Sequence, residues 1–323
     1  TTAFMSTSLL LALSYEQPTS GERLAKEYGC TRAAIAKRIN ALRDAGVLID
    51  AIAREGYRYA YPYCWWQDML MQREMAVVAP RLAWHILPSV DSTNHWMREH
   101  LKSSATGLMH MAVSDFQRAG QGRRGRQWLS LPGRQMTVTM GLVSSSSPVA
   151  WVGVAIAVGV CIAQTLNAQG WPVSLKWPND LWLGGAKLGG ILIEMDAMAE
   201  GPSHLIIGFG INEHVLSGER ESLAREVAAL SDAKQPYDRH VLLGQLAASL
   251  STMLESFAET GLAPWQAAWR RFDVLHGCEV NFERNGQWQS GIAQGIDAQG
   301  ALQIRQGDEL VSCHSGEVTV RAI

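Results

Sequence analysis

The chain has 323 residues, of which 47% are hydrophobic and 18% are charged, and its formal net charge is −2. The length predicts two or three domains, and the composition is typical of a globular protein with a sizeable core. The charge excludes a protein that is basic as a whole, so any nucleic-acid binding must come from a local patch.

Cysteine use and hydropathy indicate the compartment. The five cysteines are scattered, odd in number and without CxxC spacing, which argues against a disulfide framework and against a structural zinc site. The apolar run Leu9–Leu13 is too short for a signal peptide, and Gln164 and Thr165 within the uncharged stretch Val149–Asn167 favour a buried helix over a membrane span. We therefore expect a cytoplasmic protein without a membrane partner.

Residues 1–62 are expected to begin with two short helices. The first covers residues 6–14. The second is opened by a capping-box pattern formed by Thr19 and Glu22, and it runs through Tyr28.

A third helix, Arg32–Ala45, capped by Thr31, presents apolar residues at spacings of four and three on one face. Two strands, Val47–Ile52 and Tyr57–Ala60, then predict a hairpin wing, so the segment is typical of a winged helix-turn-helix that reads DNA. A small helical interaction domain that never touches DNA is the alternative. Candidate DNA-binding residues are Thr31, Arg32, Lys37, Arg38, Arg54 and Arg58.

A linker is expected at 63–80, with a short helix at Gln67–Met75. Residues 81–272 then alternate apolar stretches of strand and helix character, which predicts a mixed sheet backed by helices. The expected strands are Met109–Ser114, Met136–Val143, Val173–Trp177, Gly190–Glu194 and Leu205–Gly210. The expected helices are Thr93–His100, Ala150–Gln169 and Arg239–Glu259. Short strands separated by turn signals predict a small SH3-like β-barrel at 273–323, which we expect both to cover the central sheet and to help to bind ligands.

The segment Gln117–Arg126 carries three glycines and four arginines in ten residues. Glycine allows a close approach of the backbone to a ligand, and arginine presents paired donors to phosphate or carboxylate oxygens. The pattern indicates a mobile anion-binding loop, a solvated basic turn, or a segment that binds RNA without sequence preference.

Four further motifs lie at predicted strand and helix ends: Asp91-Ser92-Thr93-Asn94, KWPND at 176–180, KLGGILIE at 187–194 and GFGIN at 208–212. Taken singly, each has a simple explanation: a helix cap, a turn, a solvated lysine or a strand end. No GxxxxGK[ST] occurs, no GxGxxG opens a strand–helix unit, and no His/Cys/Asp cluster has metal-ligand spacing. A P-loop is therefore excluded, and we expect no structural metal.

Taken together, GQGRRGRQW, KWPND, KLGGILIE and GFGIN, in this order, resemble the catalytic domain of biotin–protein ligases. With the winged helix before it and the small β domain after it, the chain resembles the bifunctional biotin ligases that also repress the biotin operon. The resemblance implies that biotin and ATP form biotinyl-5′-AMP and pyrophosphate, with Mg²⁺, before biotin passes to a lysine of the biotin carboxyl carrier protein. It also implies binding to operator DNA as a homodimer when the adenylate is bound.

The resemblance further implies the site residues. Lys187, Arg123 and Asp180 would be catalytic, and Asp180 would favour the incoming amine or help to place Mg²⁺. Biotin would contact Ser92, Thr93, Asn94, Gln117, Gly120, Gln121, Gly122, Arg123, Arg124, Lys187 and Gly190. ATP and the adenylate would contact Arg123, Arg124, Trp128, Lys176, Asn179, Lys187 and Asn212.

One position departs from the family pattern, because Gln121 stands where the loop usually has its first arginine. Three rival interpretations are a ligand-sensing regulator without catalysis, an RNA-binding protein and a lipoate ligase. The first two do not require KWPND and KLGGILIE together, and a lipoate ligase shares the fold but not the arginine loop.

Overall fold

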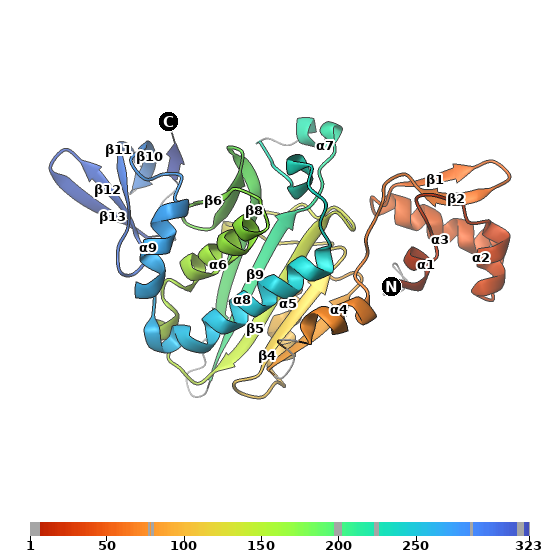
Figure 1. Ribbon diagram of the computed structural model, residues 1–323, viewed down its shortest axis with the longest axis horizontal. Helices are drawn as coiled ribbons and strands as arrows, with labels where there is room; N and C mark the ends of the chain where they lie inside the picture. Colours follow the sequence, from red (N-terminus) through yellow and green to blue (C-terminus); the bar gives the residue numbers. More distant parts are fainter. Residues whose placement is uncertain are drawn as a thin grey trace.

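The computed structural model describes residues 7–76, 78, 81–196, 202–222, 226–284, 287–314 and 320–322. Figure 1 shows a helical domain with a hairpin at the N-terminal end, a central sheet with helices, and a small sheet at the C-terminal end. The central sheet carries most of the helices and lies between the two smaller parts.

The N-terminal domain is the expected winged helix-turn-helix, with α1 Thr7–Leu11, α2 Gly21–Glu27, α3 Arg32–Asp44, β1 Ile49–Ile52 and β2 Gly56–Tyr59. The cap of α3 is confirmed, because the Thr31 hydroxyl accepts a hydrogen bond from the Ala34 N–H. The predicted capping box was wrong by one residue. Ser20 caps α2, because the backbone of Thr19 pairs with Tyr57 of the wing instead. The first helix is also shorter than expected and ends at Leu11.

The central domain contains one seven-stranded mixed sheet in the order β3-β4-β5-β9-β8-β7-β6. Only β3 and β4 are parallel neighbours, and the other pairs are antiparallel. The strands are β3 Leu82–Leu87, β4 Met109–Ser114, β5 Gln135–Ser144, β6 Val173–Lys176, β7 Asp180–Leu183, β8 Ala186–Asp196 and β9 Ser203–Asn212. The five predicted strands are confirmed, whereas β3 and β7 were not predicted.

Helices cover both faces of this sheet. The longer ones are α4 Asp68–Met75, α5 Thr93–Leu101, α6 Val154–Ala168, α8 Arg239–Thr260 and α9 Ala263–Phe272; the short ones are α7 Ser217–Ser222, η1 Arg123–Gly125, η2 Pro148–Trp151 and η3 Leu230–Ala233. Side chains alternate between the faces of a strand. Ala112 of β4 packs with α5, whereas Met111 and Val113 join the core that contains α6 and α8 (Figure 1). Hence α5 covers the face opposite to α6 and α8.

The segments Pro148–Ala168 and Arg239–Thr260 are long and apolar enough to cross a membrane by length and composition alone. In the fold they pack against each other, and more than half of each is buried inside the protein. The burial predicted for Val149–Asn167 is confirmed. The α-helix begins only at Val154, because Gly153 adopts a left-handed conformation after the 3₁₀ turn η2.

The C-terminal part is a five-stranded antiparallel sheet in the order β13-β12-β11-β10-β14. Its strands are β10 Glu279–Arg284, β11 Gln287–Ile296, β12 Leu302–Gln306, β13 Glu309–Cys313 and β14 Val320–Ala322. Gly300 and Gly307 have positive φ angles at two predicted turns, and the third predicted turn, at 285–286, lies outside the described residues. The Trp177 indole N–H donates to the Gly300 carbonyl and links this sheet to the central domain.

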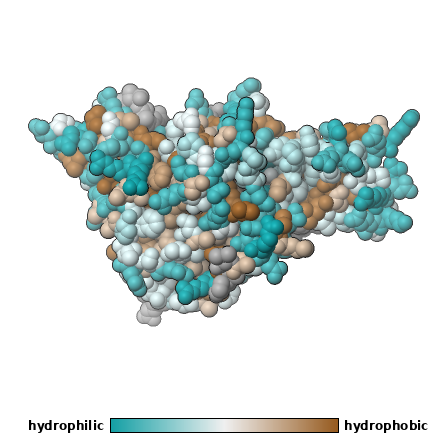
Figure 2. Space-filling view, viewed as in Figure 1, coloured by the Kyte–Doolittle hydropathy of each residue, from teal (hydrophilic) through white to brown (hydrophobic). Residues whose placement is uncertain are grey.

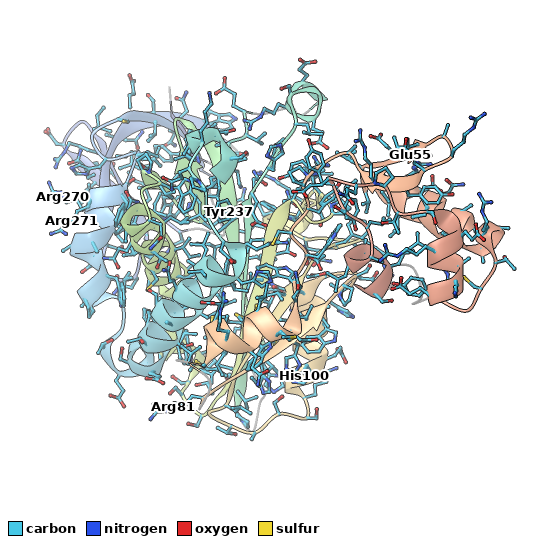
Figure 3. All side chains as sticks on the ribbon, turned by 45° about the vertical axis from the view of Figure 1, so that its right-hand side comes forward. Glu55, Arg81, His100, Tyr237, Arg270 and Arg271 are labelled. Carbon is cyan, nitrogen blue, oxygen red and sulfur yellow. The ribbon has the colours of Figure 1, made fainter. Side chains whose placement is uncertain are left out.

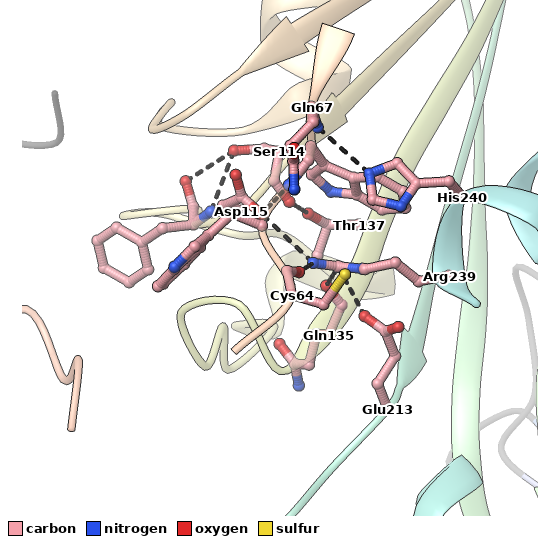
Figure 4. A network of polar contacts seen from close by, with 12 residues as sticks. Cys64, Gln67, Ser114, Asp115, Gln135, Thr137, Glu213, Arg239 and His240 are labelled. Atoms are coloured by element: carbon pink, nitrogen blue, oxygen red, sulfur yellow. Dashed lines mark hydrogen bonds and ion pairs between the residues drawn. The ribbon is translucent and has the colours of Figure 1, made fainter. Parts of the chain in front are cut away.

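A buried arginine joins the linker to the end of the central sheet (Figure 4). Arg239, the first residue of α8, is 3% exposed and lies 3.9 Å above the ring of Trp66. Its guanidinium donates to the Cys64 carbonyl and pairs with the buried carboxylates Asp115 and Glu213, the latter at 2.6 Å. Burial raises the pKa of Asp115 to about 7 and raises the pKa of Glu213, while Arg239 opposes both shifts.

Replacing Arg239 by leucine leaves two carboxyl groups buried without a cation. We expect the free energy of unfolding at pH 8 to fall by about 3–5 kcal/mol, as when one partner of a buried ion pair is removed. The loss should be smaller at pH 5, because carboxyl groups with raised pKa values in the folded state become protonated there. Urea denaturation followed by tryptophan fluorescence measures both values.

Arg81→Leu is the matched control. Arg81 pairs with Glu255 at 3.0 Å but is 71% exposed, so its loss should change the free energy of unfolding by less than about 1 kcal/mol. Equal effects of the two substitutions would contradict the role given to the buried network.

Candidate active site

A cavity of about 430 Å³ opens between α5, the arginine loop and strands β5, β8 and β9. Its volume lies within the usual range for small-molecule sites. Most of the residues proposed from the sequence line it: Ser92, Thr93, Asn94, Gln117, Gln121, Gly122, Arg123, Arg124, Trp128, Lys176, Asn179, Asp180, Lys187 and Gly190. Gly120 and Asn212 do not.

The first turn of α5 forms a neutral polar end of the cavity. The Thr93 amide and hydroxyl both donate to Gln117 Oε1, at 2.8 and 3.0 Å. Thr139 of β5 donates to Asn94 Oδ1 at 2.6 Å, and the Asn94 amide donates to Glu194 at 2.8 Å. These side chains are nearly buried and already hydrogen-bonded, so their orientation is fixed before any ligand arrives.

Two glycines of β9 make room for this arrangement. A Cβ atom at Gly208 would overlap the Asn94 side-chain amide, and a Cβ atom at Gly210 would lie 2.5 Å from the ring of Trp128. From the sequence, only the side-chain amide of Asn212 in the GFGIN motif was expected to contribute to the site. The contacts of the two glycines were not predicted. The glycines allow Asn94 and Trp128 to lie directly on the backbone of the sheet.

The arginine loop is a short hairpin rather than an irregular segment. The Gly122 N–H donates to the Arg126 carbonyl at 2.7 Å, and the Trp128 N–H donates to the Gly120 carbonyl at 2.8 Å. Its tip is the 3₁₀ turn Arg123–Gly125, where Arg124 has a φ of 58°. Gly120 belongs to the base of this hairpin, where a Cβ atom would lie 2.8 Å from the Trp128 carbonyl oxygen and 3.1 Å from Gln117 Nε2.

The opposite end of the cavity is cationic. Arg123 Nη1 donates to Asn179 Oδ1 at 3.1 Å, and Lys187 Nζ is paired with Asp180 across the β7–β8 hairpin. Gly190 lies beneath this pair, since a Cβ atom there would be 3.4 Å from Lys187 Nζ. Lys176 lies 4.6 Å from the ring centroid of Trp182.

The charges on the cavity wall are unequal. Five cationic side chains, from Arg123, Arg124, Arg126, Lys176 and Lys187, line the described cavity together with the single carboxylate of Asp180. Burial partly removes the charges of Arg123 and Lys176 from water and thereby lowers the pKa values of both groups. An anionic ligand would restore the lost solvation, so the geometry selects for phosphate or carboxylate groups at this end.

Asn212 lies in a second, smaller cavity that shares Trp128 and Lys187 with the first. Its amide accepts from Gln135 at 2.9 Å and donates to the Ala228 carbonyl at 3.0 Å. The amide is thus used within the protein and holds the segment around Ala228 beside β5.

Known protein families match all three parts of the chain. Residues 86–212 match the biotin/lipoate A/B protein ligase family, residues 6–58 match an HTH domain, and residues 275–321 match the biotin protein ligase C terminal domain. The bifunctional ligase/repressor BirA of Escherichia coli is 31% identical over 315 residues, which cover 97% of this chain and 96% of that protein. The BirA protein of Salmonella typhimurium is 32% identical, with 94% and 93% covered. The chain belongs to the bifunctional biotin ligase/repressor family.

Solved structures of biotin protein ligases share the fold. The biotin protein ligase from Aquifex aeolicus, in complex with biotin and ATP, superposes with a TM-score of 0.61 at 24% identity over 75% of this chain and 99% of that chain. The fold class expected from the sequence is confirmed, including the N-terminal helix-turn-helix and the central mixed sheet.

In this member of the family the candidate DNA-binding residues belong to the N-terminal domain, and none of them lines the cavity. Thr31, Arg32, Lys37 and Arg38 are exposed on α3, although the Thr31 hydroxyl is used as the helix cap. Arg54 is exposed at the wing, and Arg58 pairs with Asp50 across the hairpin at 3.7 Å. Figure 2 shows hydrophilic residues over the outer end of this domain, and Figure 3 shows Glu55 on the wing, away from the central sheet.

The sequence analysis also did not predict the hydrogen bonds that connect Asn94 and its neighbours on α5 to strand β8. Arg98, one turn further along α5, donates to Glu194 and to Asp196 at 2.8 and 2.9 Å. Glu194 thereby joins two residues of α5 to β8. Side chains alternate along β8, so Glu194 lies on the same face of the strand as Gly190. This alternation could have identified Glu194 from the sequence as a residue near the site.

Proposed function

We propose that the protein is an ATP-dependent biotin–protein ligase that also represses transcription of biotin biosynthesis genes. The observation that carries the proposal is one cavity with a buried neutral polar end and a cationic end. Its relatives include, besides BirA, a biotin--[acetyl-CoA-carboxylase] ligase of Paracoccus denitrificans that is 31% identical over 68% of this chain. The acceptor is therefore the biotin carboxyl carrier protein of acetyl-CoA carboxylase.

The neutral end suits the ureido ring of biotin. That ring presents one carbonyl acceptor and two N–H donors, and Thr93, Asn94 and Gln117 offer both kinds of partner in a nearly buried setting. A site with buried polar groups discriminates strongly against a ligand that lacks the matching groups, because they are left unpaired. The dithiolane ring of lipoate lacks them, so this end favours biotin.

The cationic end suits the first chemical step. The biotin carboxylate attacks the α-phosphorus of ATP, a new O–P bond forms, and the bond to the departing pyrophosphate breaks. Two anions must approach each other, and Arg123 and Lys187 would screen their repulsion and hold the groups in line. Ser92, Gln121, Gly122 and Gly190 would border the biotin chain, and Arg124, Trp128, Lys176 and Asn179 would border the adenylate.

In the second step the amine of the acceptor lysine attacks the biotinyl carbonyl and AMP leaves. Asp180 is the carboxylate on the described cavity wall, and its charge would favour the approach of this amine. The same group fits Mg²⁺, which commonly uses one or two protein carboxylates together with substrate phosphates. Mg²⁺ would supply further screening of the phosphate charge.

The hairpin at the arginine loop would protect the intermediate. A mixed anhydride is hydrolysed when water reaches it, so a segment that closes over the product preserves it. Backbone pairs at Gly120 and Gly122 let the hairpin move as one unit while Arg123 reaches the cationic end.

Lys187→Ala tests the ligase. We expect wild-type protein to release pyrophosphate with biotin and ATP but not with lipoate and ATP, and we expect Lys187→Ala to lose at least about a hundredfold in rate, as when a group that stabilises developing charge is removed. Lys102→Ala is the control, because Lys102 is exposed at the C-terminal end of α5 and does not line the cavity. Near-normal release by Lys187→Ala would refute the role of Lys187, and release with lipoate would refute the choice of substrate.

The variant Gln121→Arg tests the effect of having glutamine where the loop usually has its first arginine. Gln121 lines the cavity and pairs with Gln127 across the hairpin, so an arginine there adds a positive charge close to the anion site. We expect the variant to release biotinyl-5′-AMP about tenfold more slowly, in line with one additional charge-assisted hydrogen bond. A stopped-flow chase with unlabelled biotin measures the rate. Faster release from the variant than from wild type would overturn the expectation.

For repression we propose that the adenylate-bound protein forms a homodimer in the cytoplasm and places two winged helices on operator DNA. Arg38 is exposed on α3, at the surface that would face the duplex. We expect Arg38→Ala to weaken binding to the promoters of the biotin biosynthesis genes by about tenfold. We also expect the steepness with which the logarithm of the binding constant falls with the logarithm of the salt concentration to decrease by about one.

Electrophoretic shifts with biotin and ATP measure this binding. Arg271→Ala is the matched control, because Arg271 is an exposed arginine at the opposite end of the molecule (Figure 3). A complete lack of binding by wild-type protein in the presence of biotin and ATP would refute the regulatory half and leave the ligase proposal standing.

A further inference from the structure

Three histidines from three separate elements meet at the edge of the central sheet. His85 comes from β3, His110 from β4 and His100 from the last turn of α5. Each ring offers one nitrogen, and these three nitrogens lie within 4.8 Å of one another. His110 shares the α5 face of β4 with Ala112, so the cluster lies beneath the C-terminal end of α5, while the first turn of the same helix lines the cavity.

The separations fit a single metal ion. His110 Nδ1 lies 3.4 Å from His85 Nε2 and 3.2 Å from His100 Nε2. Zinc–nitrogen bonds are about 2.0–2.1 Å long, so two nitrogens around one tetrahedral zinc lie roughly 3.3 Å apart. Two of the three separations therefore match the edge of a tetrahedral site, and the three ligand atoms all lie within 4.8 Å of one another.

Hydrogen bonding alone leaves this arrangement incompletely satisfied. A neutral ring nitrogen carries either one hydrogen or one lone pair. His110 Nδ1 faces two nitrogens at once, so it can form one linear hydrogen bond and not two. Its other nitrogen, Nε2, is buried without a partner among the described residues. A cation between the three rings would use all three inward lone pairs.

The surroundings favour the metal-binding form of the rings. Burial and the neighbouring histidines lower the pKa of His85 to about 4 and also lower the pKa of His110, so both rings keep a lone pair at neutral pH. Trp96 stacks on His100 at 4.7 Å with an interplanar angle of 12°, which fixes that ring. His85 and His100 remain partly exposed, which leaves a path for the ion and a position for water.

We propose that His85, His100 and His110 form a binding site for one zinc-class divalent transition-metal ion, with water as the fourth ligand. Imidazole nitrogens suit zinc and its neighbours and not Mg²⁺, so the site is distinct from any metal carried by ATP. The ion ties the edge strand β3 and strand β4 to the C-terminal end of α5. The spacing 85, 100, 110 carries no recognisable motif, because the ligands come from three different elements.

Zinc binding by the full-length chain without biotin or ATP tests the site. Equilibrium dialysis against zinc chloride, with metal analysis, should give one zinc per chain in wild-type protein. His85→Gln and His100→Gln should each lower the affinity by about tenfold or more, since each removes one of three protein ligands. His95→Gln is the matched control, because His95 is exposed on the same helix; its affinity should stay within about twofold of wild type.

Two further measurements separate the site from zinc held elsewhere. Cobalt bound to wild-type protein should show the visible bands of a tetrahedral nitrogen and oxygen site and no thiolate charge-transfer band, which excludes the cysteines. Zinc should raise the Tm of wild type and His95→Gln but not of His85→Gln or His100→Gln. Absence of stoichiometric binding, equal binding by all variants, or a thiolate band would each overturn the proposal.

Discussion

The close approach of Asn94 and Trp128 to the backbone of β9 is the constraint on which the cavity depends. Both side chains lie where a Cβ atom at Gly208 or Gly210 would otherwise be. Contacts this close leave no room for adjustment in a packed interior. The glycines set the height of α5 and of the arginine hairpin above the sheet, and this height sets the depth of the cavity.

Five cationic side chains and the carboxylate of Asp180 line the described cavity at its cationic end. Asp180 is paired with Lys187, and Asn179 accepts from Arg123. Like charges that are partly desolvated raise the free energy of the empty site. Binding of an anion relieves this cost, so part of the affinity for phosphate is already present in the folded chain. The hairpin is the one element that can bring Arg123 and Arg124 to such a ligand.

Local signals predicted much of the fold. Thr31 followed by apolar residues at spacings of three and four gave α3 correctly, because capping and periodicity act over a few residues. The strand β7 was missed, because it begins at Asp180, the last residue of a motif that is typical of a turn. Ser20 rather than Thr19 caps α2, since pairing with the wing takes Thr19 away, and such a tertiary contact leaves no local signal.

The candidate site was predicted from its sequence motifs. The contacts between residues of different motifs were not predicted. The place of Gly208 against Asn94, and of Arg98 against Glu194, depends on which strands are neighbours in the sheet. The three histidines show the same limit, because 25 residues separate His85 from His110 and only the parallel pairing of β3 with β4 brings them together. Side-chain type is readable from sequence, but strand order is a property of the whole chain.

The segment that follows the hairpin also contacts the linker and the N-terminal domain. A Cβ atom at Gly133 would lie 2.6 Å from the ring of Trp65 in the linker, and Gly46 of the N-terminal domain faces Pro132. Asp115, two residues before the loop, belongs to the buried network of Arg239. The hairpin therefore lies between residues that contact the buried network of Arg239 on one side and residues that contact the linker and the N-terminal domain on the other. Coupling between two sites requires that both bias the same element, and this segment contacts both the hairpin and the N-terminal domain.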